Sequence, residues 1–443
     1  MNRFMERLAV VVLLGIFLIL SSNQPVLAGE VGILIEKLVE KGVLTRSEAR
    51  ELLKKSQKVA TEEKKSADLK IYWNKGIRLS TEDKAFTFKM GGRIMNDWAF
   101  ISEDKSIEDT IGDLQDSATE FRKARFYIQG TIYDRIIFKA QYDFAGGDND
   151  FKDVYLGLKK LPWVGTLKVG HFKEPFGLEE LTSSKYGAFM ERGLPGVFTP
   201  SRNTGISVSK AEFNDRFTWS VGAFLDTDDD GDDNQAEHNF AAAARVTGLP
   251  WYEGNDRLLH LGTAYSYRDA KDDVVRFRQR PEAHLADFRL VDTGNINADS
   301  ENRFGIEAAL VYGPFSLQGE YMFTKVDTLN GSDPRFFGYY TYASYFLTGE
   351  HRVYKKSAGL FGRVKPKRNF GDRGGLGAWE LALRYSGIDL SDEGIEGGEL
   401  DNITLGVNWH LNPNVRTMLN YIRADLDDVG DADILQMRFQ VDF

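Results

Sequence analysis

The sequence predicts an all-β protein: a 16-stranded antiparallel transmembrane β-barrel that follows a short N-terminal helical periplasmic module. Apolar and polar residues alternate with a period of two from Lys70 onward, over segments of about ten residues. These segments are joined by alternately short and long connections and have aromatic residues near their ends, which is typical of outer-membrane barrels. The length of 443 residues allows about three globular domains or one large barrel, and the sustained alternation favours the barrel.

Composition excludes several other classes of protein. The chain has no cysteine, which excludes a disulfide framework, a zinc-thiolate site and a thiol nucleophile. After the N-terminus no apolar stretch reaches about 18 residues, so a bundle of membrane-spanning helices is excluded. The net charge of −10 argues against a nucleic-acid partner, and an aromatic content of 12% argues against wholesale disorder.

Residues 1–28 are interpreted as a secretory signal peptide. Arg3 and Arg7 form a basic start, an apolar run covers Leu8–Leu20, and small residues precede a cleavage site after Ala28. The run is too short to span a bilayer, although an uncleaved anchor helix is the alternative interpretation. We therefore expect the chain to be exported.

Residues 29–68 are expected to form a separate periplasmic helical module and linker. Thr45 and Glu48 have the spacing of a capping box, which predicts a helix from Arg46 to about Lys58. The polar stretch 57–68 lacks apolar residues and predicts a linker. A coiled-coil or cell-wall contact is one hypothesis for this module, and a solvated spacer is the other.

Residues 69–443 are expected to form the barrel domain. The final segment shows the alternation best, because Leu435, Met437, Phe439, Val441 and Phe443 share one face of a strand. Sixteen strands are expected at 86–101, 121–130, 136–145, 151–158, 166–172, 204–212, 217–225, 238–247, 258–268, 303–312, 315–325, 338–347, 377–387, 401–411, 415–425 and 434–443. An even number of strands places the first residue of the first strand and the last residue of the final strand on the periplasmic side. A further strand within 71–79 is interpreted as a ribbon that precedes the barrel.

Three connections are longer than a turn requires: 173–203, 269–302 and 348–376. By strand parity the first two start outside the cell and the third starts in the periplasm. A barrel of this size is too wide to fill with its own side chains and encloses an aqueous passage. Long connections rich in aromatic and apolar residues are seldom plain tethers, so we expect all three to fold into the lumen.

Basic residues are concentrated where this passage should be narrow. Arg276, Arg278 and Arg280 occur at a spacing of two, so an extended backbone directs all three to one side, roughly 7 Å apart. We call these three residues the entrance ladder. The connection 348–376 has eight basic residues against two acidic ones.

The barrel wall adds further bases. Four of them have the parity opposite to the apolar face: Arg93, Lys123, Arg125 and Lys139. Arg122 has the wrong parity and requires a bulge or a strand-end position. One hypothesis is that these bases only balance internal acids such as Asp97, Asp143 and Asp153. The other is that they select anions, as rings of Arg and Lys do in narrow pores.

Eight short segments together are highly specific for a known family. They are Phe88-Lys89-Met90-Gly91-Gly92-Arg93, Phe121-Arg122-Lys123-Ala124, Gly177-Leu178-Glu179 with Thr182-Ser183-Ser184-Lys185, Glu191-Arg192, Arg280-Pro281, Gly349-Glu350, Gly377-Ala378-Trp379-Glu380-Leu381 and Leu405-Gly406-Val407-Asn408-Trp409. In these segments the chain resembles the phosphate-selective porins O and P, over nearly the whole mature barrel. The resemblance implies a homotrimer of sixteen-stranded channels whose third and fifth external loops and a long periplasmic turn enter the lumen.

The resemblance also implies an anion-binding constriction. The matching positions are Arg93, Arg122, Lys123, Asp153, Ser183, Ser184 and Arg192, with Lys185 beside them and Arg278 and Arg280 in the entrance ladder. Where the well-known phosphate channels have tyrosines, this chain has Arg125 and Lys173, and where they have a central loop lysine it has Glu180. The two added bases either compensate for this carboxylate or change which anion is preferred.

One acidic turn fits a metal-binding pattern. Asp226, Asp228, Asp230 and Glu237 occupy positions 1, 3, 5 and 12 of a calcium loop, with Gly231 at position 6. The flanking segments are expected strands rather than helices, so an acidic hairpin turn is the alternative to a structural calcium ion. No other cofactor is expected.

The expected function is an outer-membrane channel for passive uptake of small anions, with phosphate or polyphosphate as substrate. The expected location is the outer membrane of a Gram-negative cell, in contact with lipid and lipopolysaccharide, with the N-terminal module in the periplasm. The alternatives are a general or differently selective porin and a barrel that anchors the envelope through residues 31–68. Enzymatic activity is disfavoured, because no G-x-S-x-G turn occurs.

Overall fold

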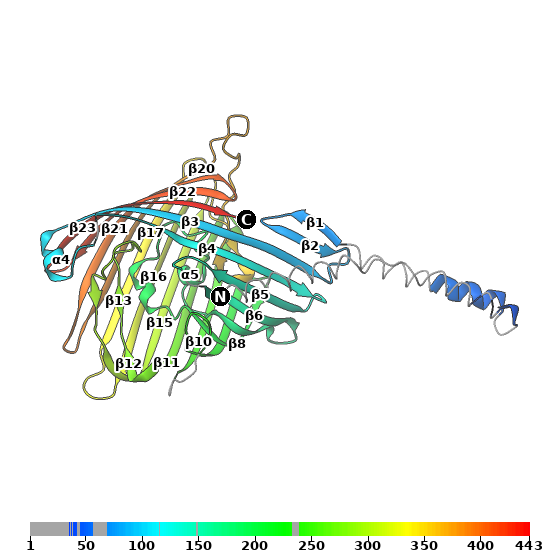
Figure 1. Ribbon diagram of the computed structural model, residues 1–443, viewed down its shortest axis with the longest axis horizontal. Helices are drawn as coiled ribbons and strands as arrows, with labels where there is room; N and C mark the ends of the chain where they lie inside the picture. Colours follow the sequence, from blue (N-terminus) through cyan, green and yellow to red (C-terminus); the bar gives the residue numbers. More distant parts are fainter. Residues whose placement is uncertain are drawn as a thin grey trace. The chain divides into compact units, whose positions relative to one another are not determined.

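The computed structural model describes residues 35, 37, 39–41, 45–55, 69–114, 116–147, 149–232 and 239–443. The chain divides into two compact units, one of which contains 71–79 and 86–443. The unit that contains 86–443 is a closed antiparallel barrel (Figure 1). The prediction of a 16-stranded barrel is confirmed.

The barrel strands follow the predicted segments closely. They are β3 (Thr87–Glu103), β4 (Ser117–Ile132), β5 (Ile136–Asp143), β6 (Asp150–Leu161), β7 (Gly165–Lys173), β8 (Arg202–Glu212), β9 (Phe217–Leu225), β10 (Phe240–Gly254), β11 (Arg257–Asp269), β15 (Ile296–Tyr312), β16 (Phe315–Thr328), β17 (Arg335–Phe346), β20 (Ala378–Asp392), β21 (Ile395–Asn412), β22 (Val415–Leu426) and β23 (Gly430–Asp442). Several extend beyond the predicted bounds at the end expected to lie outside the cell.

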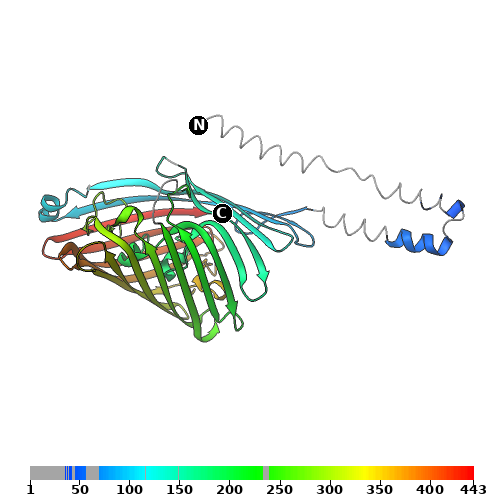
Figure 2. The ribbon, with the colours of Figure 1, turned by 90° about the horizontal axis from the view of Figure 1, so that it is seen from below.

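Each barrel strand pairs with its neighbour in sequence, and the last strand pairs with the first. β23 is antiparallel to β3, with Arg438 opposite Asp97 across the closing seam. Figure 2 shows the red C-terminal strand beside the blue to cyan N-terminal strands of the barrel. Closure leaves no unpaired edge in the ring, as a membrane-spanning sheet requires.

Two bands of half-buried to exposed aromatic side chains run around part of the barrel exterior. Near the loop end of the strands, Tyr265, Phe304 and Phe323 form a chain of ring contacts. Near the short-turn end, Trp251 stacks on Tyr312 and Trp379 stacks on Trp409. Between the bands the outward positions are apolar, for example Leu383 and Leu405. Such girdles lie at the two interfaces of an outer membrane.

The remaining elements are short. They are β1 (Leu69–Trp73), β2 (Ile77–Thr81), α4 (Lys105–Thr110), α5 (Leu178–Leu181), η1 (Leu194–Phe198), η2 (Lys271–Asp273), β12 (Val274–Val275), β13 (Arg278–Gln279), β14 (Val291–Asp292), β18 (Tyr354–Lys355), η3 (Lys356–Ala358) and β19 (Leu360–Phe361). The single strand expected within 71–79 is two strands, β1 and β2, that pair as a hairpin. Gly76 permits this reversal, with a φ of 123°.

The other unit contains the helical segment expected near the N-terminus. Residues 46–55 are helical, the Thr45 amide donates to Glu48 Oε2 at 2.9 Å, and the Glu48 amide donates to Thr45 Oγ1 at 3.3 Å. The predicted capping box is therefore present. The signal peptide and the linker 57–68 lie outside the described residues. Within the described ranges, no helix is long and apolar enough to cross a membrane.

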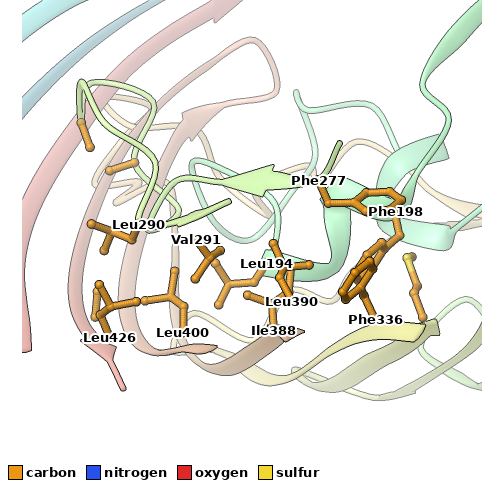
Figure 3. Packing of buried hydrophobic residues seen from close by; sticks show 14 of the residues in the cluster. Leu194, Phe198, Phe277, Leu290, Val291, Phe336, Ile388, Leu390, Leu400 and Leu426 are labelled. Atoms are coloured by element: carbon orange, nitrogen blue, oxygen red, sulfur yellow. The ribbon is translucent and has the colours of Figure 1, made fainter. Parts of the chain in front are cut away.

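The three long connections, 174–201, 270–295 and 347–377, contact lumen-facing wall residues. Figure 3 shows Leu194, Phe198, Phe277, Leu290 and Val291 of the first two connections packed against Phe336, Ile388, Leu390, Leu400 and Leu426 of the wall. In the third, the Tyr354 hydroxyl lies 2.6 Å from His260 Nδ1 and the Arg352 guanidinium donates to Gln318 at 2.8 Å. These contacts agree with the predicted infolding.

Candidate functional site

The connection 174–201, called the constriction loop below, is fixed at both ends by hydrogen bonds to the wall. Glu320 of β16 accepts hydrogen bonds from the amides of Leu178 and Glu179, each at 2.7 Å. Ser386 of β20 accepts one from the Leu194 amide at 2.9 Å. Backbone groups that a lumenal loop cannot pair with itself are thereby satisfied.

Three buried wall arginines hold the middle of the constriction loop by its carbonyl oxygens. Arg416 donates to Ser184 and Gly187, Arg438 to Met190, and Arg384 to Glu191, over 2.5–3.2 Å. This segment thus turns its carbonyl oxygens toward β20–β23. Sequence reasoning missed these arginines, although each has the polar parity of its strand.

Opposite these carbonyls, two cations converge on the loop hydroxyls. Arg93 Nη1 lies 2.9 Å from Ser184 Oγ and 3.4 Å from Ser183 Oγ, and Lys123 Nζ lies 3.1 Å from Ser184 Oγ. Among the described residues, no carboxylate lies within 4.0 Å of either cation. Nε of Arg93 is buried and has no acceptor in the described part of the chain. The arrangement supplies positive charge and hydrogen-bond donors that could be turned to an anion.

A small cleft opens at these groups. Its polar lining includes the cations Lys123, Arg192 and Arg352, the hydroxyls of Ser183 and Ser184, and two carboxylates, Glu179 and Glu191. Phe189 is among its apolar lining residues. Apolar walls beside a few converging donors are the usual construction of a small-ligand site. Arg93 does not line the cleft itself but binds the two lining serines from behind. We call Arg93, Lys123, Ser183 and Ser184 the cleft quartet.

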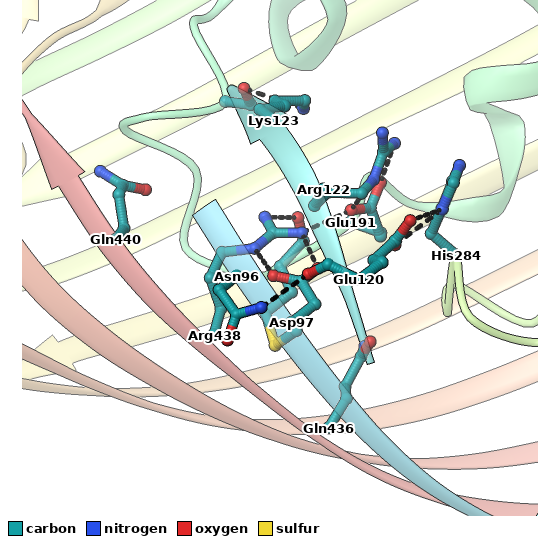
Figure 4. Close-up of polar contacts among 12 residues, drawn as sticks. Asn96, Asp97, Glu120, Arg122, Lys123, Glu191, His284, Gln436, Arg438 and Gln440 are labelled. Atoms are coloured by element: carbon teal, nitrogen blue, oxygen red, sulfur yellow. Dashed lines mark hydrogen bonds and ion pairs between the residues drawn. The ribbon is translucent and has the colours of Figure 1, made fainter. Parts of the chain in front are cut away.

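Arg122 reaches the lumen through a bulge, as its parity requires. Met95 of β3 pairs with Lys123 and Asn96 pairs with Phe121, so Arg122 is the unpaired residue of β4. Its guanidinium binds the Glu191 carboxylate in bidentate fashion at 3.0 and 3.1 Å (Figure 4). Burial alone would raise the pKa of Glu191, but Arg122 and then Arg438 hold that pKa well below its usual range. Arg122 is therefore neutralised.

Four other predicted site residues are also paired. Arg125 binds Asp143 at 2.5 Å, Asp153 binds Arg202 at 2.8 Å as well as Lys139, and Lys173 and Arg192 both bind Glu180 at 2.8 Å. The hypothesis that wall bases balance internal acids thus describes this part of the lumen. The cleft quartet is the part to which it does not apply.

Lys185 follows the two serines on the far side of the constriction loop. Its ammonium lies 3.5 Å from Asp442 and near the rings of Tyr127 and Tyr186. Burial lowers the pKa of Lys185 to about 7, and the charge of Asp442 opposes this shift. The charge of Lys185 is therefore lost near neutral pH.

The entrance ladder keeps its predicted alternation over part of its length. Arg276 and Arg278 are exposed, with buried Phe277 between them. Arg276 is paired with Asp292, whereas Arg280 donates to the Ala286 carbonyl at 2.7 Å. No carboxylate of the described residues lies within 4.0 Å of Arg278 or Arg280, and of these two arginines Arg278 is the more exposed.

The tip of the connection 270–295 is fixed to the wall near the constriction loop. Glu282 binds Arg384 and accepts a hydrogen bond from Thr404 at 2.9 Å. His284 pairs with Glu120 at 2.8 Å (Figure 4). Arg384 therefore touches both infolded connections, since it also donates to the Glu191 carbonyl.

The acidic turn predicted as a calcium loop is only partly described. Asp226 binds Arg268 at 3.1 Å, and Asp228 Oδ1 accepts hydrogen bonds from the amides of Asp230 and Asp232. Glu237 lies outside the described residues. Among those described, no three His, Asp or Glu side chains are grouped as metal ligands. Calcium binding at this turn stays a prediction.

Comparison with known proteins agrees with this architecture. Porin O of Pseudomonas aeruginosa is 30% identical over 410 residues, which cover 83% of this chain and 90% of that protein. Two solved structures share the fold, each covering 81% of this chain and 100% of its own: an anion-selective porin from Comamonas acidovorans (TM-score 0.53, 15% identity) and the trimer form of OmpT, an outer membrane protein of Vibrio cholerae (TM-score 0.51, 13% identity). The family model of the phosphate-selective porins O and P matches residues 88–443, and the chain belongs to this family.

Proposed function

We propose that this outer-membrane porin is a channel for passive uptake of small anions, with phosphate or polyphosphate as its substrate. The observation that carries the proposal is the cleft quartet, in which Arg93 and Lys123 share the Ser184 hydroxyl and lack a carboxylate within 4.0 Å in the described chain. Fixed cations and hydroxyls of this kind replace the hydration shell of an anion in a narrow pore.

Family membership supports the rest of the proposal. Porins are channels and not enzymes, so the lumenal charges act on permeation rather than on bond chemistry. A homotrimer in contact with lipid and lipopolysaccharide, a Gram-negative outer membrane and a periplasmic N-terminal module belong to the same proposal. The exterior aromatic bands are consistent with that membrane setting.

A second candidate is an anion porin with a different preference. Glu180 favours it, because this carboxylate lies in the constriction and binds both Lys173 and Arg192. A barrel that only anchors the envelope is the remaining alternative, and it predicts no ionic current.

The test is single-channel recording of the refolded protein in planar bilayers. The reversal potential in a chloride gradient gives anion selectivity, and titration with phosphate gives the concentration that halves the chloride current. We expect anion selectivity with phosphate block, and we expect the half-blocking concentration to rise about tenfold or more in Lys123→Met, because a charge-assisted hydrogen bond is lost.

Lys168→Met is the matched control for this variant. Lys168 is also a wall lysine, but its ammonium lies over the rings of Tyr155 and Phe172 and outside the cleft. Cation selectivity in the unmodified protein, or phosphate block equal in Lys123→Met and Lys168→Met, would contradict the proposal. Absence of any current would favour the envelope anchor.

A further inference from the structure

The constriction loop carries an anion of its own beside the cleft. Glu180, in α5, has a side chain only 3% exposed. Its Oε1 lies 2.8 Å from Lys173 Nζ and its Oε2 lies 2.8 Å from Arg192 Nη1. Lys173 Nζ also donates to the Glu180 backbone carbonyl, which fixes the ammonium against the loop.

The position of this carboxylate relates it to permeation. Arg192 lines the same cleft as Lys123 and the two serines, and its side chain is 36% exposed. Arg192 and Arg352 are the other two cations that line this cleft, and of the two only Arg192 is bound by a carboxylate of the described residues. Glu180 already occupies the Arg192 guanidinium from the buried side.

Glu180 is ionised under all ordinary conditions. Burial alone would raise the pKa of its carboxyl, but the charges of Arg192 and Lys173 outweigh burial and lower the pKa to about 2. The carboxylate therefore competes for both cations at neutral pH. Because it is attached to the loop, this competitor is present at a high and constant effective concentration.

We propose that Glu180 is a specificity-determining residue of the channel, a tethered counter-anion that occupies Lys173 and Arg192 and confines a permeating anion to Arg93 and Lys123. The inference rests on the proposed function, which it deepens by saying how firmly the cleft retains its substrate. An anion held by fewer cations dissociates faster. The channel is therefore expected to conduct small anions rapidly rather than to bind them tightly.

The physical basis is competition between oxyanions for the same donors. Carboxylate and phosphate both accept the paired N–H groups of a guanidinium. Removal of one partner of a buried ion pair leaves an uncompensated charge, and here the removal of Glu180 would leave two. A mobile anion can enter from the cleft and neutralise Arg192, which lines it.

The test is the neutral, nearly isosteric variant Glu180→Gln in the full chain, with inorganic phosphate as the probe. We expect the half-blocking phosphate concentration to fall about tenfold or more, since charge-assisted hydrogen bonds become available. We also expect phosphate to raise the thermal unfolding temperature of this variant more than that of the unmodified protein. A gain in affinity is not the outcome of structural damage.

Glu301→Gln is the matched control. Glu301 is a buried wall carboxylate of β15 that binds Arg303 at 2.5 Å and does not line the cleft. We expect its half-blocking concentration to equal that of the unmodified protein. In the double variant Glu180→Gln with Arg192→Gln, the gain should be largely lost, because one of the released cations is then missing.

The outcomes separate the inference from the proposed function. A protein without anion selectivity or phosphate block refutes the proposed function. A protein with phosphate block, whose half-blocking concentration is unchanged or higher in Glu180→Gln, refutes the role of Glu180 alone. If Glu180→Gln does not assemble, Glu180→Asp withdraws the carboxylate by one methylene, and a half-blocking concentration that does not fall refutes the inference equally.

Discussion

At the scale of single residues, the charge that the lumen offers to an anion depends on which cations already have an anionic partner. Arg122, Arg125 and Lys173 are all basic and all near the constriction, yet each binds a carboxylate of the protein. Arg93 and Lys123 differ only in that their nearest polar partners are hydroxyls. A hydroxyl satisfies a donor without cancelling its charge, so these two residues keep most of their attraction for anions.

Lys185 adds a charge that depends on pH. Because burial lowers its pKa to about 7, the ammonium is charged below neutral pH and uncharged above it. Chloride does not titrate, so we expect chloride conductance to fall by a factor of about 1.5 as the pH rises from about 6 to about 8. The measurement is single-channel conductance in chloride at fixed ionic strength.

Two variants separate the contribution of Lys185 from that of any other group that titrates between about pH 6 and about pH 8. Lys185→Arg stays charged throughout and should remove this fall while keeping the higher conductance. Lys185→Met should give the lower conductance at both pH values. The same pH profile in Lys185→Arg and the unmodified protein would assign the effect to another group.

At the scale of elements, strand alternation was predictable and loop geometry was not. A barrel strand has lipid on one side and water on the other, so its period of two is present in the sequence itself. The bulge at Arg122 was also predictable, because Arg122 breaks the alternation of apolar and polar residues along its strand. In contrast, the pairing of Glu180 with Arg192, or of Arg416 with the Ser184 carbonyl, depends on how a loop crosses the lumen. No local pattern encodes such long-range contacts.

Arg416 of β22 shows how the wall positions the constriction loop. It donates to the carbonyls of Ser184 and Gly187, and no carboxylate of the described residues lies within 4.0 Å of it. In Arg416→Met we expect a loss of about 1.5–3 kcal/mol for each hydrogen bond to a charged group. Ser184 should then be held less firmly. We expect a noisier open-channel current and a half-blocking phosphate concentration that is about threefold to tenfold higher.

Arg416→Lys separates position from charge. Lysine keeps the positive charge but lacks the planar fork that spans two carbonyls. We therefore expect its current noise to resemble that of Arg416→Met and its anion selectivity to resemble that of the unmodified protein. Quiet current in both variants would show that the loop is held without this arginine.

At the scale of the whole molecule, the sign of the charge changes between surface and lumen. The chain has a net charge of −10, yet its cleft and entrance ladder are basic. Acidic residues gather instead in turns such as 425–433, which has five aspartates and no base. Exposed charges act through solvent and are screened, whereas the buried lumenal cations act at contact distance. Under the proposed function, local arrangement rather than net charge is expected to govern selectivity.

This separation predicts how selectivity depends on salt. Asp427 and Asp428 lie exposed between β22 and β23, at the end of the barrel that carries the long loops 104–116 and 270–295. The screening length is about 10 Å at 0.1 M salt and about 3 Å at 1 M. These aspartates should repel anions near this end of the channel. Asp427→Asn with Asp428→Asn should therefore raise chloride conductance up to about twofold at about 0.1 M salt and leave it unchanged at about 1 M.

Asp134→Asn is the control at the opposite end of the barrel, in the turn between β4 and β5. This variant should instead affect the current of the opposite polarity. Equal changes at both salt concentrations would mean that the aspartates act by contact and not through the field.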